Sequence, residues 1–211
     1  MSGTVFWDVD TQVDFMRPDG KLCVPGAVEI VPALLALTRH ARARAIVRVA
    51  SVCDHVPGDD ELSDTPDFVA TFPPHCLRGT PGQAKIPETA LEAPVVVPNR
   101  REDPAVLAER LARQTGEVLI EKNHFDVFTN PNASALVDAL APETVVVYGV
   151  AQDVCDAQAI AGFLRRGGTR VVFVEDAARA IDASRGAALL AEWKASGVAV
   201  LQTADVLRDV R

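Results

Sequence analysis

The chain has 211 residues, of which 48% are hydrophobic, and this composition is typical of a folded protein with a sizeable buried core. Its formal net charge is −8 and its pI is near 5.0, which argues against nucleic acid or an anionic membrane as the main partner. We expect no signal peptide, because the first residues contain neither a basic region nor an apolar region after it. We expect no membrane span, because no apolar run approaches the roughly 20 residues needed to cross a bilayer.

Short apolar runs alternate along the chain with segments of helical periodicity. The candidate strands, of which the one at 94–98 is short, are 4–9, 45–51, 94–98, 116–122, 143–150, 170–176 and 198–203. The candidate helices are 27–43, 103–114, 132–140, 153–168 and 184–197. Between the second strand and the third lies a stretch rich in Pro, Asp and Gly, residues 53–82, without a clear period; a loop of that length is usually functional.

The order of these segments indicates the fold class. Strands and helices alternate, and the strands are continuously apolar, as in parallel sheets buried on both faces. We predict a single domain over residues 1–211. Its architecture is α/β, with three layers in the order α/β/α and a mainly parallel, Rossmann-like central sheet of about six strands.

Polar residues gather where the predicted strands end. Ligands of such sheets bind at the carboxyl ends of the strands, near the point where the strand order reverses. Among the polar residues there, Asp10, Lys122 and Cys155 come from three different strand ends and could meet. The other candidates at these ends are Asp8, Gln12, Asp14, Ser51, Cys53, Asp54, His55, Glu121, His124 and Asp153.

An aspartate, a lysine and a cysteine form a chemically sensible group. A thiol with a pKa of about 8.5 needs help to become a nucleophile, and a helix N-terminus and an ammonium both favour the thiolate. A nearby carboxylate can take the thiol proton and pass it to a leaving amine. The residues alone leave the structural alternatives open: Asp10 as a strand cap, Lys122 as a surface residue and Cys155 as a small core residue.

Four segments, in order, resemble motifs of the isochorismatase-like cysteine hydrolases, the superfamily that includes the nicotinamidases. "DVDTQVDF" is similar to the D-x-Q-x-D-F signature, and "TFPPHCLRGTPG" resembles a nicotinamidase stretch with P-P-H-C and G-T-P-G. "EKNHFDVF" resembles the lysine segment, and "YGVAQDVCDAQA" the segment G-V-A-T-D-x-C. Together the matches cover most of the chain, from about residue 4 to 203.

The resemblance implies roles for particular residues. Asp10 matches the catalytic carboxylate, Lys122 the catalytic lysine and Cys155 the nucleophile. The bond between Val150 and Ala151 matches a non-proline cis peptide, and the N–H groups of Ala151 and Cys155 would hold the oxyanion. The resemblance also implies pocket-lining positions for four phenylalanines, which are Phe15, Phe72, Phe125 and Phe128.

The chain departs from the resemblance at the metal site. Nicotinamidases place Asp-x-His at the end of the second strand and further histidines in the next loop, whereas here Cys53 takes the Asp position, followed by His55 and His75. The middle histidine is missing, and Asp60 is the nearest candidate. A thiolate in such a set favours zinc over magnesium or manganese. A decayed site that binds no metal remains the alternative.

These observations lead to a functional hypothesis with open alternatives. We expect a cytoplasmic cysteine amidohydrolase that acts on a small amide, nicotinamide-like by default, through a thioester intermediate. The alternatives are a non-catalytic, metal-binding or oligomer-forming member of the same fold, and a redox role for the thiols. The scattered cysteines without a C-x-x-C pair suit a reducing compartment, and the resemblance suggests a homo-oligomer.

Overall fold

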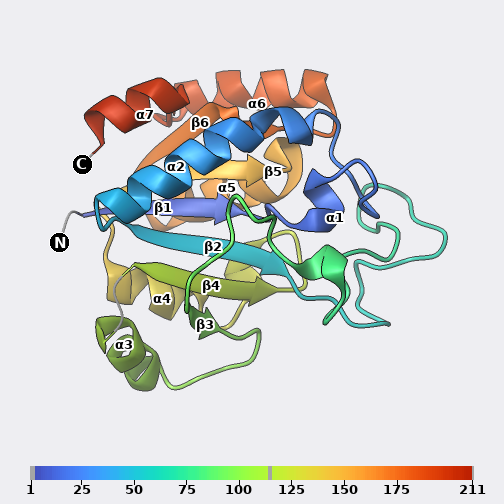
Figure 1. Cartoon of the computed structure of the whole chain (residues 1–211), viewed down its shortest axis with the longest axis horizontal. Helices are drawn as coiled ribbons and strands as arrows, with labels where there is room; N and C mark the ends of the chain where they lie inside the picture. Colours follow the sequence, from blue (N-terminus) through green and yellow to red (C-terminus); the bar gives the residue numbers. More distant parts are fainter. Residues whose placement is uncertain (1–2, 114–115, 211) are drawn as a thin grey trace.

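The structure, a computed structural model, describes residues 3–113 and 116–210 and is built around one parallel sheet. The seven strands lie in the order β3-β4-β2-β1-β5-β6-β7, and all neighbouring pairs are parallel (Figure 1). The strands are β1 (Thr4–Val9), β2 (Val47–Cys53), β3 (Val95–Val97), β4 (Glu117–Lys122), β5 (Thr144–Val150), β6 (Arg170–Arg179) and β7 (Ala199–Leu201). The parallel sheet is confirmed, and the expected count of about six strands is corrected to seven.

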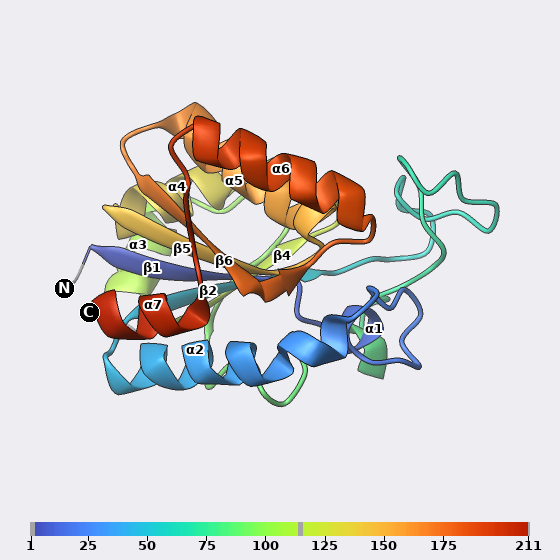
Figure 2. The same ribbon diagram turned by 90° about the horizontal axis from the view of Figure 1, so that it is seen from above.

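Helices cover both faces of the sheet, so the three-layer architecture is confirmed (Figure 2). One face carries α1 (Val13–Met16), α2 (Val31–Ala43) and α7 (Thr203–Asp209). The other face carries α3 (Pro104–Arg113), α4 (Ala133–Leu140), α5 (Ala157–Arg166) and α6 (Ala183–Ala195). The predicted helix 103–114 corresponds to α3, and its last position lies outside the described residues. No helix in the described ranges is both long enough and apolar enough to span a membrane.

Strand β5 shows why the strands read as continuous apolar runs. Val145 and Val147 belong to the core under α4, α5 and α6, whereas Val146 and Tyr148 belong to the core under α2 and α7. Because both faces of the strand are buried, neither face needs polar residues. The strand therefore has no hydrophobic alternation.

The ends of the four central strands position the candidate site. The chain runs from β1 to the strands on one side of it and crosses back to β5 on the other side, so the strand order reverses at β1. The carboxyl ends of β1, β2, β4 and β5 therefore lie together at one edge of the sheet, the location at which ligands of such folds bind. The long loop after β2 projects beyond this edge (Figure 1).

Candidate functional site

The structure brings Asp10, Lys122 and Cys155 into direct contact. Asp10 directly follows β1, Lys122 is the last residue of β4, and Cys155 lies in the π-helix η4 (Gln152–Asp156) after β5. The Nζ atom of Lys122 lies 2.7 Å from Oδ2 of Asp10 and 3.7 Å from Sγ of Cys155. All three side chains are buried, and Ser51 donates a hydrogen bond of 2.6 Å to the other oxygen of Asp10.

The ion pair between Asp10 and Lys122 keeps both groups charged. Burial acts to raise the pKa of Asp10, but the Lys122 ammonium and the hydrogen bond from Ser51 outweigh burial, so that the pKa is lowered. Burial acts to lower the pKa of Lys122, but the charge of the Asp10 carboxylate and its hydrogen bond with Lys122 outweigh burial and raise the pKa. At neutral pH the site therefore holds a carboxylate and an ammonium.

Cys155 is a thiol in the resting site. Burial raises the pKa of Cys155 well above its usual value, and the opposing effect of Lys122 is the smaller one. The thiol also hydrogen-bonds to the Asp10 carboxylate. The proton of the thiol consequently has an ionised acceptor beside it.

The backbone around Cys155 holds the thiol close to Asp10. The Val150–Ala151 peptide bond is cis, and the N–H groups of Val154 and Asp156 donate to the carbonyl of Ala151. One residue earlier, Gly149 has φ of 132°, and a Cβ there would collide with the carbonyl of Val9. Glycine thus allows the end of β5 to approach the end of β1, from which Asp10 extends.

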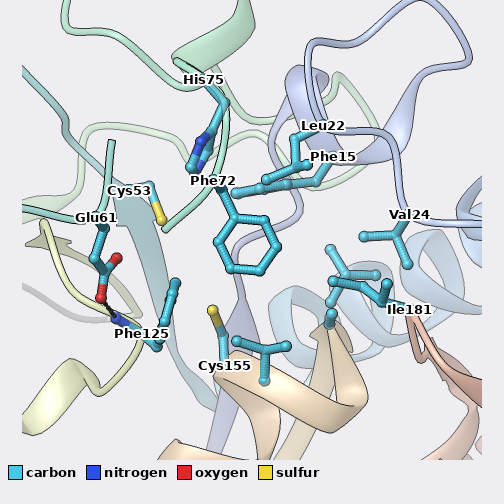
Figure 3. A pocket seen from close by; sticks show the side chains of 13 residues that line it. Phe15, Leu22, Val24, Cys53, Glu61, Phe72, His75, Phe125, Cys155 and Ile181 are labelled. Carbon is cyan, nitrogen blue, oxygen red and sulfur yellow. Dashed lines mark hydrogen bonds between the residues drawn. The ribbon is translucent and has the colours of Figure 1, made fainter. Parts of the chain in front are cut away.

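A largely apolar pocket lies over the thiol (Figure 3). Phe15, Phe72 and Phe125 line it, as the resemblance implies, and so do Val150 and Ala151. The other lining residues are Leu22, Val24, Cys53, Glu61, His75, Val154, Cys155 and Ile181.

The structure does not place Phe128 among the lining residues. Its ring packs edge-to-face on Phe163, with 5.3 Å between the ring centroids, and against Gly162 of α5. The pocket position that the resemblance implies for Phe128 is therefore corrected to a packing role.

Cys53, His55 and His75 form a cluster that could hold a metal ion. One donor atom from each lies within 4.8 Å of the others. Nδ1 of His55 contacts Asp59 at 3.2 Å, and Nδ1 of His75 contacts the carbonyl of Pro73 at 2.8 Å. Each ring therefore carries its hydrogen on Nδ1, which leaves the lone pair of Nε2 for a ligand.

Two further observations bear on whether a metal fits. Nε2 of His55 is buried and has no hydrogen-bond partner among the described residues, as expected for an atom that ligates an ion. Cys53 Sγ lies 3.2 Å from Lys122 Nζ, and burial raises the pKa of this thiol. The donor set, one thiol and two imidazoles, suits zinc with one position left open.

Asp60 lies outside the cluster. Its side chain is exposed, whereas its neighbour Asp59 contacts His55. The expected fourth ligand is therefore absent from the cluster, and the carboxylate that contacts the His55 ring is Asp59.

Sequence reasoning missed Glu61, which lines the pocket. This residue is 7% exposed, and its Oε1 atom accepts the backbone N–H of Phe125 at 2.7 Å. Glu61 lies in the long loop, where no period indicates which side chains point inward. The signal that marks it is tertiary: an isolated bridge pairs Leu62 with Phe72 and turns the loop back over the site.

Several other polar residues at the strand ends stabilise the fold. Asp8 pairs with Arg48 at 3.1 Å and with Lys85 at 2.8 Å. Gln12 exchanges hydrogen bonds with the backbone of Cys53, at 2.7 and 2.9 Å. These contacts fix the positions of β1, β2 and the long loop, and they take no part in the pocket.

Comparisons with known proteins identify related chains. The family model "Isochorismatase domain" matches residues 5–205. A nicotinamidase/pyrazinamidase of Mycobacterium tuberculosis is 38% identical over 74 residues, which are 35% of this chain and 39% of that protein, so the match spans about two fifths of the relative's length.

Solved structures share the fold. A pyrazinamidase of Pyrococcus horikoshii in complex with zinc has a TM-score of 0.75 at 21% identity, covering 95% of this chain and 99% of that one. An N-carbamoylsarcosine amidase of Thermoplasma acidophilum has a TM-score of 0.71 at 22% identity, covering 96% and 97%.

Proposed function

We propose that this chain, which belongs to the isochorismatase family, is a cysteine-dependent amidohydrolase that opens a small amide through a thioester intermediate. The observation that carries the proposal is the buried contact of one ammonium, Lys122, with a carboxylate and with thiols. Its N–H groups reach Asp10, Cys53 and Cys155. Sulfur is a weak acceptor, so this arrangement is better explained by thiolate chemistry than by stabilisation of the fold.

In the acylation step, the Sγ atom of Cys155 attacks the amide carbon while the thiol proton moves to Asp10. The Lys122 ammonium favours the thiolate and lies against the carboxylate that takes the proton. We assign the developing oxyanion to the N–H groups of Ala151 and Cys155, at the turn between β5 and η4. When the C–N bond breaks, Asp10 returns the proton to the nitrogen, and ammonia or an amine leaves.

In the deacylation step, a water molecule attacks the thioester carbon. Asp10, again ionised, takes a proton from the water, and the C–S bond breaks as the sulfur leaves. The proton then returns to Cys155, so the products are a carboxylic acid and the free thiol. The enzyme ends in the protonation state from which it started.

We propose that the metal site holds zinc through Cys53, His55 and His75. A bound zinc would supply a Lewis-acid position next to the pocket for a donor atom of the substrate or for water. Because the pocket is lined by phenylalanine rings, we propose a compact planar carboxamide as the substrate, with nicotinamide as the first compound to test. The names of the relatives, nicotinamidase/pyrazinamidase and N-carbamoylsarcosine amidase, support amides as the substrate class.

The proposal is tested by ammonia release from a panel of small amides that includes nicotinamide, pyrazinamide and N-carbamoyl amino acids. We expect Cys155→Ala to lose activity by a factor on the order of 10⁴, because the nucleophile is gone. Cys23→Ala, which removes an exposed thiol that does not line the pocket, is the matched control and should retain activity. With a slow substrate, mass spectrometry should find the acyl group on Cys155.

Two outcomes would contradict the proposal. Full activity of Cys155→Ala would rule out thiol catalysis. Absence of ammonia release from every amide, in a folded wild-type protein, would favour the alternative of a non-catalytic member of the fold.

A further inference from the structure

We propose that Glu61 determines which amides the pocket accepts: the substrate carries a positively charged amine, and the free carboxylate oxygen of Glu61 binds it. The inference rests on the proposed function, since it names the class of amide. It starts from the one carboxylate among the residues that line the pocket, which Figure 3 shows beside Cys53 and Phe125.

Among the described residues, the contacts of this carboxylate involve one of its two oxygens. Oε1 accepts the N–H of Phe125 at 2.7 Å and lies 3.4 Å from Nδ1 of His124. In the ranges that the structure describes, no residue donates a hydrogen bond to Oε2. Figure 3 shows this second oxygen turned away from the Phe125 backbone. The carboxylate therefore keeps a free acceptor at the pocket wall.

Among the described residues that line the pocket with Glu61, there is no lysine or arginine. A carboxylate in apolar surroundings is costly unless a cation or hydrogen bonds compensate it. Lys122 is committed to Asp10 and the thiols, and His124, the nearest basic side chain, is 40% exposed and contacts the oxygen that is already bonded. Burial raises the pKa of Glu61, and the hydrogen bond from Phe125 together with the charges of Lys122 and His124 offsets only part of this effect. A cationic ligand in the pocket would compensate the negative charge of Glu61.

The aromatic residues around Glu61 suit an alkylammonium group as the cation that binds its carboxylate. The rings of Phe72 and Phe125 lie edge-to-face with 5.5 Å between their centroids, and both line the same pocket as the carboxylate. Aromatic faces combined with a carboxylate bind alkylammonium groups. The N–H of Phe72 also donates to the carbonyl of Glu61 at 2.8 Å, which fixes the aromatic wall relative to the carboxylate.

Glu61 is separate from the metal cluster. The donor atoms of Cys53, His55 and His75 form a group within 4.8 Å of one another, and the carboxylate of Glu61 is not part of it. The pocket thus presents two recognition groups besides the thiol: the cluster for an ion and Glu61 for an amine.

The test compares two primary amides that differ in charge, 3-(aminomethyl)benzamide and benzamide, for the wild type and Glu61→Gln. Glutamine keeps the acceptor for the N–H of Phe125 and removes the charge. We expect the wild type to prefer the cationic amide in kcat/KM. We expect this preference to fall at least tenfold in Glu61→Gln, mainly through KM of the cationic amide.

Glu121→Gln is the matched control, because Glu121 is a half-buried carboxylate one residue before Lys122 that does not line the pocket. The ratio of kcat/KM for the cationic amide to kcat/KM for benzamide should be the same in Glu121→Gln as in the wild type. The inference is wrong if Glu61→Gln leaves the ratio unchanged, or if the wild type prefers benzamide. It is also wrong if Glu61→Gln loses bound zinc, which would make the carboxylate a metal ligand.

A binding measurement separates this inference from the proposed function. Calorimetry of 3-(aminomethyl)benzamide with Cys155→Ala and with the double variant that adds Glu61→Gln needs no turnover. Weaker binding to the double variant, without amide hydrolysis by the wild type, would support the role of Glu61 and contradict the amidohydrolase. Hydrolysis by the wild type with equal binding to both variants would contradict only the role of Glu61.

Discussion

Cys53 belongs to two groups of residues at once. Its sulfur lies 3.2 Å from the ammonium of Lys122, and it is also the thiol of the cluster with His55 and His75. Lys122 and Cys53 are direct neighbours in the register of β4 and β2, so their side chains lie on the same face of the sheet. A metal ion bound by the Cys53 thiolate would therefore sit next to the ammonium of Lys122, for which we propose a catalytic role, and metal content and activity should be linked.

The metal prediction follows from the three donors. We expect the purified protein to contain about one equivalent of zinc by elemental analysis, because structural and catalytic zinc sites use thiolate and imidazole ligands. His75→Ala should lose most of this zinc, since two ligands bind far more weakly than three. His40→Ala is the control, because His40 stacks on Phe6 away from the cluster. Equal zinc in wild type and His75→Ala would show that the cluster is not the binding site.

The contact between the three proposed catalytic residues could be predicted from the sequence better than the rest of the site. Asp10, Lys122 and Cys155 sit at or just beyond strand ends, and the order of elements alone brings strand ends together. Asp60 and Glu61 lie in a long loop, whose side-chain directions depend on contacts such as that between His55 and Asp59. Neighbouring carboxylates in such a loop are indistinguishable in sequence, although one is exposed and the other lines the pocket.

At the scale of elements, the strands and the long helices followed from periodicity, and the short helices did not. Helix α1 has four residues and α7 has seven, too few for a helical period to be recognised. The predicted helix 153–168 is divided into η4 and α5, because the chain after the cis peptide first winds as a π-helix. This segment carries Cys155, so the irregular part of the element is the part with the proposed function.

Helix α5 is held by a close contact at Gly162. A Cβ at this position would collide with the ring of Phe128, which also packs on Phe163. We therefore expect Gly162→Ala to lower the free energy of unfolding by about 1–3 kcal/mol, although alanine is the better helix former by about 1 kcal/mol. Urea denaturation measures the change.

A double-mutant cycle identifies the cause. Phe128→Ala removes the ring, so adding Gly162→Ala to that variant should cost less than it does in the wild type. If Gly162→Ala is as stable as the wild type, or if the two changes are additive, the contact between α5 and Phe128 is not what constrains this position.

In the molecule as a whole, several buried charges among the described residues have partners of opposite sign. Arg48 lies 3.1 Å from Asp8 and 2.7 Å from Glu117 in the core, and Lys122 pairs with Asp10. Asp156 is different: it is fully buried, and neither of its carboxyl oxygens has a hydrogen-bond partner among the described residues. Burial raises its pKa well above the usual value, and the negative charges of Asp10 and Asp8 raise it further.

The raised pKa of Asp156 determines the sign of its effect on stability. The unfolded chain releases this proton near pH 4, whereas the folded protein holds it to higher pH, so the folded state loses stability as the pH rises above about 4. Asn at this position does not titrate. We therefore expect the free energy of unfolding of Asp156→Asn to exceed that of the wild type at pH 7 by about 1–3 kcal/mol, with the difference shrinking toward pH 4.

The measurement is urea denaturation of chelator-treated protein between pH 4 and 7, with Asp67→Asn as the control of opposite sign. Asp67 accepts the backbone N–H groups of Val69, Ala70 and Thr71, and these bonds lower its pKa to about 2. The pKa of Asp67 is lower in the folded protein than in the unfolded chain, where it is near 4. The ionised carboxylate therefore stabilises the folded state at pH values above about 4, and this stabilisation is lost as the pH falls toward 2. Asp67→Asn should therefore be less stable than the wild type by a nearly constant amount across pH 5 to 7, where the effect of Asp156→Asn grows. A pH-independent difference for Asp156→Asn would mean that Asp156 is ionised and compensated in the folded protein.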